Sequence, residues 1–303
     1  MTRPVVFPSQ MFEPKTVDDS FAPQRRAAEA AGLPTFLVNQ EHLDEGSFGR
    51  AVRRIDASGT GIYRGWMLGV EQYAGLHSAL AERGLSLINT PAQYRHCHYL
   101  PESFALIESR SPASVWVPLG EGGMDVDAVV QAAQAFGDAP VVIKDYVKSR
   151  KHEWEEACFV PSAIDEDRLR RVVCTFVERQ GDFLSGGVVV REFVELETVG
   201  THPKSGMPLT REHRVFVLDG EPLLAGRYWA DAEYESGELP LAQFATIMRS
   251  IRSRFFTMDL ARGKDGTWRI IELGDGQVAG LLDTIAPEDF FARLAERSSD
   301  APT

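Results

Sequence analysis

The chain has 303 residues, enough for one large or two ordinary domains. Hydrophobic residues make up 44% and charged residues 25%, an ordinary globular composition that argues against wholesale disorder. Asp and Glu number 44 against 32 Lys and Arg, a net charge of −12, so the surface as a whole repels a phosphate backbone and nucleic acid is disfavoured as a partner.

The first third of the chain alternates short apolar runs with helical patterns. Strands are expected at residues 4–7, 35–39, 61–66 and 85–89, and helices at 22–31, 70–83 and 101–109. Strands that alternate with helices imply a partly parallel sheet, so residues 1–112 are interpreted as an N-terminal α/β domain.

The remainder of the chain, residues 113–303, has a different pattern. Strands are expected at 114–119, 139–147, 186–197, 255–261 and 267–277, and helices at 125–136, 165–180, 238–254 and 287–297. A hairpin is expected over residues 212–229, with Asp219-Gly220 as its turn. The long segment 201–213, with Lys204 and Ser205, is expected to be a substrate loop or lid.

Three cysteines cannot all pair internally, and no Cys-x-x-Cys pair is present, which fits a reducing compartment. The N-terminus has no apolar segment of the secretory type, and no run approaches 18 apolar residues. We therefore expect a cytoplasmic protein with no membrane partner, and the oligomeric state stays open.

Familiar nucleotide and metal motifs are absent. The chain has no Walker-type phosphate loop. His96-Cys97-His98 resembles a metal site, but no second ligand cluster has zinc spacing, so these residues are expected in a polar loop.

Charged residues interrupt apolar strands in a fixed order. Lys144 lies in an apolar run, where a buried lysine without an anion is costly. Asp259 and Glu272 interrupt the apolar strands FFTMDLA and WRIIEL. A lysine that meets phosphate oxygens and carboxylates that hold a hard divalent ion are the groups that bind a nucleotide with Mg²⁺.

Each of these residues also has an ordinary interpretation. Glu195 and Glu197 alternate with Leu196 and equally fit a solvent-facing strand. The segment from Lys148 to Lys151 fits a solvated charge run. Arg64 equally fits a structural salt bridge.

The same motifs, together with YRGWML (63–68), INTP (88–91), KDYVKS (144–149), SGMPLT (205–210) and ELGDGQ (272–277), resemble the ATP-grasp superfamily and are most similar to a bacterial group within it. The resemblance covers about residues 60–285. It implies an α/β N-terminal domain followed by a two-lobed α+β ATP-grasp domain, with lobes at about 113–197 and 198–303 that hold ATP between them.

The resemblance assigns roles to individual residues. Lys144 matches the strand lysine that contacts phosphates, and Lys148 and Lys151 stand where the family has a glycine-rich flap. Adenine and ribose are expected at Glu192, Phe193, Val194, Glu195 and Glu197.

The expected metal ligands are Asp259 and Glu272, with Asp275 in place of an asparagine that the chain lacks after Glu272. We expect Mg²⁺, with Mn²⁺ as an alternative, and repulsion among the three carboxylates when nucleotide is absent. Arg214, Arg227 and Arg64 are the candidates to hold phosphoryl or carboxylate oxygens.

The resemblance implies an ADP-forming, Mg-dependent ligase that joins a carboxylate to an amine through an acyl phosphate, with small-molecule or peptide substrates. Two alternatives stay open. One is phosphoryl or nucleotidyl transfer to another acceptor, such as a nucleic-acid end, and the other is an ATP-binding regulatory protein without turnover.

Overall fold

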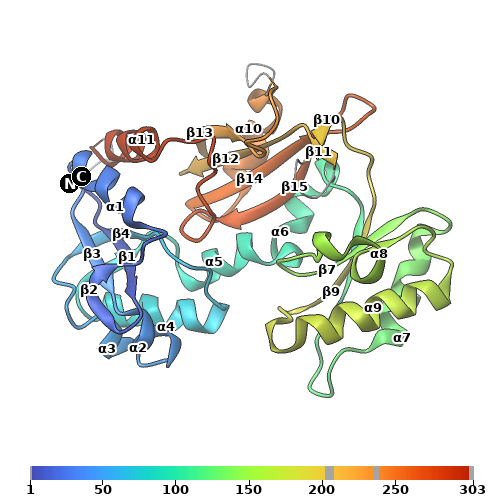
Figure 1. Ribbon diagram of the computed structural model, residues 1–303, viewed down its shortest axis with the longest axis horizontal. Helices are drawn as coiled ribbons and strands as arrows, with labels where there is room; N and C mark the ends of the chain where they lie inside the picture. Colours follow the sequence, from blue (N-terminus) through green and yellow to red (C-terminus); the bar gives the residue numbers. More distant parts are fainter. Residues whose placement is uncertain (1, 202–207, 235–238, 300–303) are drawn as a thin grey trace. The chain divides into compact units, whose positions relative to one another are not determined.

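The computed structural model describes residues 2–201, 208–234 and 239–299 (Figure 1). The chain forms two compact units. Unit 1 consists of Met1–Cys97, Thr198–Leu260 and Glu272–Thr303, and unit 2 of His98–Glu197 and Ala261–Ile271. Unit 1 therefore combines most of the expected N-terminal domain with most of the expected second lobe. Lys204 and Ser205 of the expected lid lie outside the described residues.

The N-terminal part of unit 1 is an α/β layer, as the sequence predicts. Its strands are β1 (Val5–Gln10), β2 (Glu13–Val17), β3 (Thr35–Val38), β4 (Gly59–Tyr63) and β5 (Leu85–Leu87). β1 pairs parallel with β3 and β4, β4 pairs parallel with β5, and β2 pairs antiparallel with β1. The helices are α1 (Ala22–Ala30), α2 (Gln40–Asp44), α3 (Phe48–Ala51), α4 (Val70–Ala81) and α5 (Pro91–His98).

His96-Cys97-His98 belongs to α5, so the loop expected for these three residues is wrong. The helix begins at Pro91, where a proline suits the first helical position because it has no N–H to leave unbonded.

The second sheet has the order β13-β12-β14-β15. Its strands are β12 (Glu212–Leu218), β13 (Glu221–Arg227), β14 (Phe255–Arg262) and β15 (Trp268–Asp275). Asp219 and Gly220 make the β12–β13 turn with φ of 51° and 79°, a left-handed conformation that suits Asp-Gly. The small strands β10 (Thr198–Thr201) and β11 (Pro208–Thr210) pair with each other.

The expected helix over 238–254 is shorter in the structure. It consists of a 3₁₀ turn at Leu241–Phe244 followed by α10 (Ala245–Ser250). The C-terminal helix α11 (Pro287–Ser299) lies beside α1 in Figure 1. Phe290 and Phe291 of α11 share one core with Phe7 of β1 and Phe216 of β12, so the two ends of the chain stabilise the same unit.

Unit 2 is an antiparallel sheet covered by helices. The strand order is β6-β9-β7-β8, with β6 (Ser114–Pro118), β9 (Gly187–Glu192), β7 (Val141–Asp145) and β8 (Phe159–Val160). The helices are α6 (Leu100–Ile107), α7 (Val126–Ala133), α8 (Trp154–Ala157) and α9 (Glu166–Gln180).

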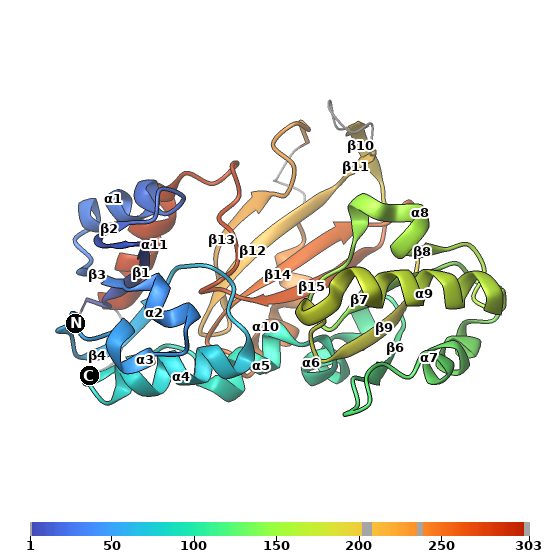
Figure 2. The ribbon, with the colours of Figure 1, turned by 60° about the horizontal axis from the view of Figure 1, so that its bottom comes forward.

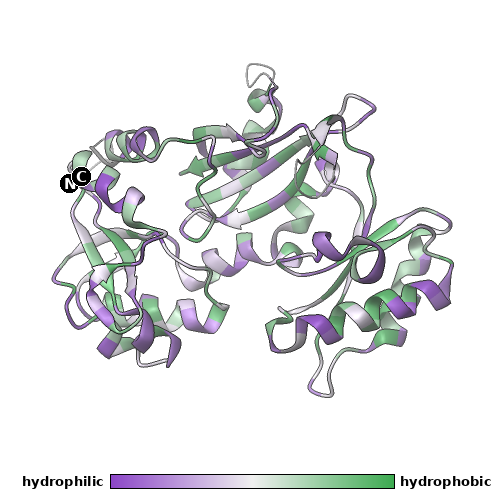
Figure 3. Cartoon of the chain, in the orientation of Figure 1, coloured by the Kyte–Doolittle hydropathy of each residue, from purple (hydrophilic) through white to green (hydrophobic). Residues whose placement is uncertain are grey.

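One face of this sheet carries the core of unit 2. Val141 and Ile143 of β7 and Val188 and Val190 of β9 pack against α7 and α9. Figure 2 shows α9 beside β7, and Figure 3 shows the mixed hydropathy of α9, which is typical of a helix with one buried side. Within the described ranges, no helix is long and apolar enough to cross a bilayer.

Gly187, at the start of β9, allows the close approach of β6. Its φ is 154°, and a Cβ there would collide with the carbonyl oxygen of Val117 and lie 2.8 Å from the Cα of Pro118. We expect Gly187→Ala to lower the free energy of unfolding by about 2 kcal/mol, because both the conformation and the contact oppose a side chain.

Urea titration followed by circular dichroism measures this loss. Gly122→Ala is the control, because a Cβ at Gly122 meets no atom within 4 Å. Equal stability of the two variants would contradict the expectation.

Candidate functional site

Lys144 lies near the end of β7 and opposite Val189 of β9, with a relative exposure of 7%. Its Nζ donates a hydrogen bond to the carbonyl oxygen of Val147 at 3.3 Å. A buried ammonium group needs strong acceptors or an anion, so its position agrees with the phosphate contact predicted from the sequence. The role itself stays a prediction.

The turn after Lys144 is held by Asp145, which sequence reasoning did not single out. Its carboxylate is buried, and Oδ1 accepts hydrogen bonds from the backbone N–H groups of Val147 (2.7 Å) and Lys148 (2.5 Å). Its Oδ2 accepts from Nε2 of Gln180 at 2.8 Å. An aspartate followed by two turn residues is the available sequence signal.

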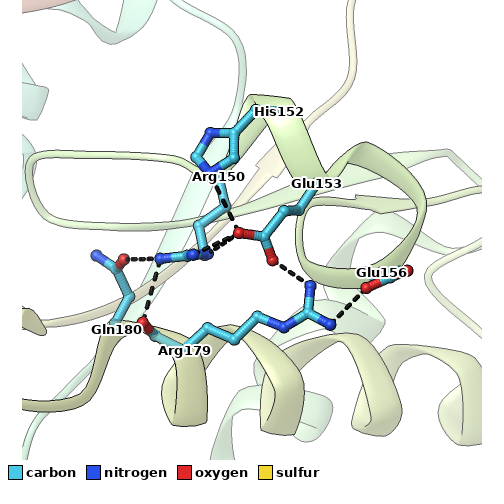
Figure 4. A network of polar contacts seen from close by, with 6 residues as sticks. All are labelled: Arg150, His152, Glu153, Glu156, Arg179 and Gln180. Carbon is cyan, nitrogen blue, oxygen red and sulfur yellow. Dashed lines mark hydrogen bonds and ion pairs between the residues drawn. The ribbon is translucent and has the colours of Figure 1, made fainter.

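The charge run after the turn divides into two kinds of residue. Lys148 and Lys151 are exposed, as phosphate-binding side chains would be. Arg150 instead points at α9, where it contacts Glu153 and Gln180 (Figure 4).

The segment predicted to face adenine follows β9 and begins with its last residue. Glu192 donates its backbone N–H to the carbonyl oxygen of Ala113 at 2.9 Å. The ring of Phe193 lies 5.7 Å from Trp154 and 5.1 Å from Phe159, centroid to centroid, in edge-to-face contacts. Val194 is half-buried. This segment therefore carries a partly buried aromatic cluster.

The two acids predicted for ribose are paired with bases in the β14–β15 turn region. Oε2 of Glu195 lies 3.1 Å from Nζ of Lys264, and Oε2 of Glu197 lies 3.0 Å from Nη1 of Arg262. These partly exposed pairs agree with the ordinary interpretation of both residues, and the ribose role stays a prediction.

Unit 1 joins two of the other predicted residues in an ion pair. Nε and Nη2 of Arg214 each lie 2.8 Å from one carboxylate oxygen of Asp259, while Nη1 donates to the carbonyl oxygen of Gly280 at 3.2 Å. Burial alone lowers the pKa of Arg214, but the hydrogen bonds and charge of Asp259, with a contribution from Glu272, raise it above its ordinary value. The expectation that nucleotide-free Asp259 is repelled by its neighbours is therefore wrong, because a guanidinium neutralises it.

Asp275 lies in the interior of unit 1 with no exposed surface. Oδ2 accepts a hydrogen bond from Nδ2 of Asn89 at 2.6 Å, and Oδ1 accepts from the backbone N–H of Gln277 at 2.8 Å. Burial raises the pKa of Asp275 to about 6. Both oxygens are thus engaged inside the protein, which favours a structural role.

Asn89 is a residue that sequence reasoning missed. Besides Asp275, its side chain bonds the backbone of β14 and the residue before it, donating to the carbonyl oxygen of Phe255 (2.7 Å) and accepting from the N–H of Arg254 (2.8 Å). The available signal was an asparagine directly before Thr-Pro at the end of a predicted strand.

Arg64 is also internal, with a relative exposure of 1%. Nη1 donates to the carbonyl oxygens of Gly276 (2.5 Å) and Ala279 (2.9 Å), and Nη2 donates to Oε1 of Gln24 (3.1 Å). Burial lowers its pKa to about 10. These contacts favour a structural interpretation over the catalytic one.

Arg227, at the end of β13, is half-buried, and its guanidinium lies 5.9 Å from the ring centre of Tyr234. It faces His213 across the β12–β13 ladder. No ion pair of Arg227 occurs among the described residues, so its charge agrees with the predicted role of holding an anionic group.

The predicted metal ligands were tested against this geometry. No group of three or more His, Cys, Asp or Glu side chains in the described part of the chain is arranged to hold a metal ion. Asp259 and Glu272, on neighbouring strands, both act on the charge of Arg214. Two carboxylates fit Mg²⁺ that arrives with nucleotide phosphates, because this ion commonly takes only one or two protein carboxylates.

The Arg214–Asp259 pair generates a stability prediction. We expect Asp259→Asn to lower the free energy of unfolding by about 3 kcal/mol, because it leaves a largely buried guanidinium without its counter-ion. Chemical denaturation of the nucleotide-free protein measures the change. Asp219→Asn is the matched control, since Asp219 makes a similar two-bond contact with Arg254 on the surface and should lose less than about 1 kcal/mol. A more stable Asp259→Asn variant would contradict this.

The second prediction concerns pH. Burial, and then the charges of Arg211 and Arg227, lower the pKa of His213 from 6.5 to about 4. Between these values the unfolded chain binds more protons than the folded chain, so stability rises with pH. The stability from neutral His213 is present above pH 6.5 and is lost as pH falls towards 4, by roughly 3 kcal/mol.

Denaturation midpoints between pH 4 and 7 test this. His213→Gln should flatten the dependence, whereas His42→Gln, which removes a partly exposed histidine, should leave it unchanged. An unchanged slope in His213→Gln would refute the assignment.

Solved structures similar to this chain share its fold. A D-cycloserine synthetase, DcsG, is 14% identical, with 97% of this chain and 99% of that chain covered and a TM-score of 0.60. The ATP-grasp ligase PsnB, complexed with a phosphomimetic precursor variant, Mg and ADP, is 17% identical, with 99% of both chains covered and a TM-score of 0.58.

A D-alanine–D-alanine ligase from Bacillus anthracis, complexed with ATP, is 15% identical, with 99% of this chain and 97% of that chain covered and a TM-score of 0.55. No curated protein sequence matches the chain. The model of an ATP-grasp domain family, the third family of its clade, matches residues 135–294, more than half of the sequence. The chain therefore belongs to this family of ATP-grasp domains.

Proposed function

We propose that this protein is an ATP-dependent ligase that joins a carboxylate to an amine through an acyl-phosphate intermediate, with Mg²⁺ as cofactor and ADP as product. The observation that carries the proposal is Lys144, a nearly buried lysine near the end of β7 in a domain of the ATP-grasp family. The exposed cations Lys148 and Lys151 follow on the adjoining segment.

Unit 2 supplies the groups assigned to the nucleotide. Lys144 contacts phosphate oxygens, and Lys148 and Lys151 add positive charge. The segment from Glu192 to Val194 faces the base, and the aromatic cluster around Phe193 gives that segment an apolar setting. Glu195 and Glu197 are assigned to the ribose hydroxyls, for which each must exchange or share its present basic partner.

Unit 1 supplies carboxylates and arginines. Asp259 and Glu272 are assigned to Mg²⁺, which when bound neutralises phosphate charge. Arg214, held by Asp259, and Arg227 are assigned to phosphoryl or carboxylate oxygens of the substrates. Asp275 and Arg64, first considered for metal binding and catalysis, are here assigned to support of the strand ends, because both are fully engaged in internal hydrogen bonds.

The solved neighbours support two classes of substrate. Two of them are named for small amino-acid products, D-cycloserine and D-alanyl-D-alanine, and PsnB is complexed with a precursor peptide. We therefore propose a small-molecule or peptide carboxylate with an amine as the second substrate, acting in the cytoplasm.

Nucleotide binding provides the test. Mg-ATP at about 100 times its dissociation constant should stabilise the wild type by about 2.7 kcal/mol, because the ligand binds only the folded state. Lys144→Ala should lose most of this stabilisation while the nucleotide-free melting temperature changes little. Lys15→Ala, at an exposed lysine of β2, is the control. An unaltered response of Lys144→Ala to Mg-ATP would refute the phosphate contact.

The reaction class is decided by its products. A screen of amino acids and peptides should release ADP together with a condensed product found by mass spectrometry. Release of AMP or pyrophosphate would instead indicate nucleotidyl transfer, and tight ATP binding without any turnover would indicate a regulatory protein.

A further inference from the structure

Glu153 is the centre of an ion cluster in unit 2 that no site role has used (Figure 4). Its Oε1 accepts hydrogen bonds from Nε (3.0 Å) and Nη2 of Arg150, and its Oε2 accepts from Nη1 of Arg179. The second terminal nitrogen of Arg179 lies 2.5 Å from Oε2 of Glu156. Glu153, with 20% of its side chain exposed, is therefore bound on both oxygens by guanidinium groups from two segments.

The cluster fastens the segment after Lys148 to the end of α9. Arg150 and Glu153 belong to that segment, whereas Arg179 is near the last residue of α9. Arg150 also donates to the carbonyl oxygen of Arg179 at 3.2 Å. One carboxylate thus links the two elements, although they are more than twenty residues apart in sequence.

Gln180, the last residue of α9, connects the cluster to the turn that follows Lys144. Its Oε1 accepts from Nη1 of Arg150 at 3.0 Å, and its Nε2 donates to Oδ2 of Asp145 at 2.8 Å. Asp145 in turn holds the backbone N–H of Lys148. The stretch from Lys148 to Lys151 is therefore anchored to α9 at both ends.

The charges in this stretch are sorted by the same contacts. Arg150 is neutralised by Glu153, while Lys148 and Lys151 stay exposed. Hydrogen bonds from Arg150 and then Arg179 lower the pKa of Glu153 to about 2, so the carboxylate stays ionised at neutral pH. The segment contains no glycine, so its path depends on side-chain anchors and not on a mobile glycine-rich backbone.

We propose that Glu153 is a positioning residue for the nucleotide phosphates, which acts by holding the Lys148–Lys151 segment in the place where its two lysines meet phosphate oxygens. This inference rests on the proposed function, because it requires that ATP binds at Lys144. Glu153 itself touches no phosphate, since a carboxylate would repel one.

The test compares a ligand that has phosphates with one that lacks them, using the full chain. Calorimetric titration with Mg-ATP, and competition of adenosine against Mg-ATP, give both affinities. We expect Glu153→Gln to bind Mg-ATP roughly tenfold more weakly, because displaced lysines lose part of their contacts, and to bind adenosine with little change. Glu153→Asp, which keeps the charge, should recover part of the loss.

Glu155→Gln is the matched control. Glu155 lies in α8, shortly after Glu153, and its Oε2 lies 3.3 Å from Nη2 of Arg168, near the start of α9. This variant therefore also removes an ion pair with α9, but not an anchor of the Lys148–Lys151 segment, and it should bind both ligands like the wild type. If Glu153→Gln does not fold, Arg179→Gln replaces it, because it removes the same link from the α9 side.

The outcomes separate the two hypotheses. Unchanged Mg-ATP affinity in Glu153→Gln would overturn the positioning role, and so would equal losses for Mg-ATP and adenosine, which indicate a general structural effect. If the wild type binds no Mg-ATP, the proposed function fails and this inference fails with it.

Discussion

Unit 1 depends on a carboxylate that has no contact with solvent. Asp275 ends β15, and burying its charge is costly unless hydrogen-bond donors surround it. Asn89, from the end of β5, supplies one donor and also bonds the backbone at the start of β14, while Gln277 supplies another. The N-terminal sheet and the C-terminal sheet are therefore joined by polar groups that water cannot replace, and this explains why segments from both ends of the sequence form one compact unit.

A second buried charge on the same sheet serves a different purpose. Asp259 is balanced by Arg214 across neighbouring strands, so the nucleotide-free protein keeps a carboxylate inside without a metal ion. A guanidinium beside two carboxylates also limits the affinity for a free divalent ion, because positive charge is already present. Nucleotide phosphates would change this balance, since they bring negative charge that both Arg214 and Mg²⁺ can share.

Unit 2 meets the demand for phosphate binding with side chains. A glycine-rich loop presents backbone N–H groups and moves easily, but the segment after Lys144 has charged residues in its place. Such a segment must lose the freedom of several long side chains when it is ordered. The contacts of Asp145, Glu153 and Gln180 with one another's segments provide that order before any ligand binds.

The sequence by itself determined the features that depend on neighbours along the chain: the α/β pattern of the first third, the Asp219-Gly220 hairpin, the amphipathic helix α9 and the motifs that resemble the ATP-grasp family. Periodicity did not predict the short helix α5, because eight residues with polar side chains carry little of it. Only the tertiary structure decided what each charge does. Arg214 meets Asp259 45 positions away, and Asn89 meets Asp275 186 positions away. Whether a carboxylate binds a cation of the protein, an internal donor or a metal depends on such distant partners, and local pattern carries no information about them.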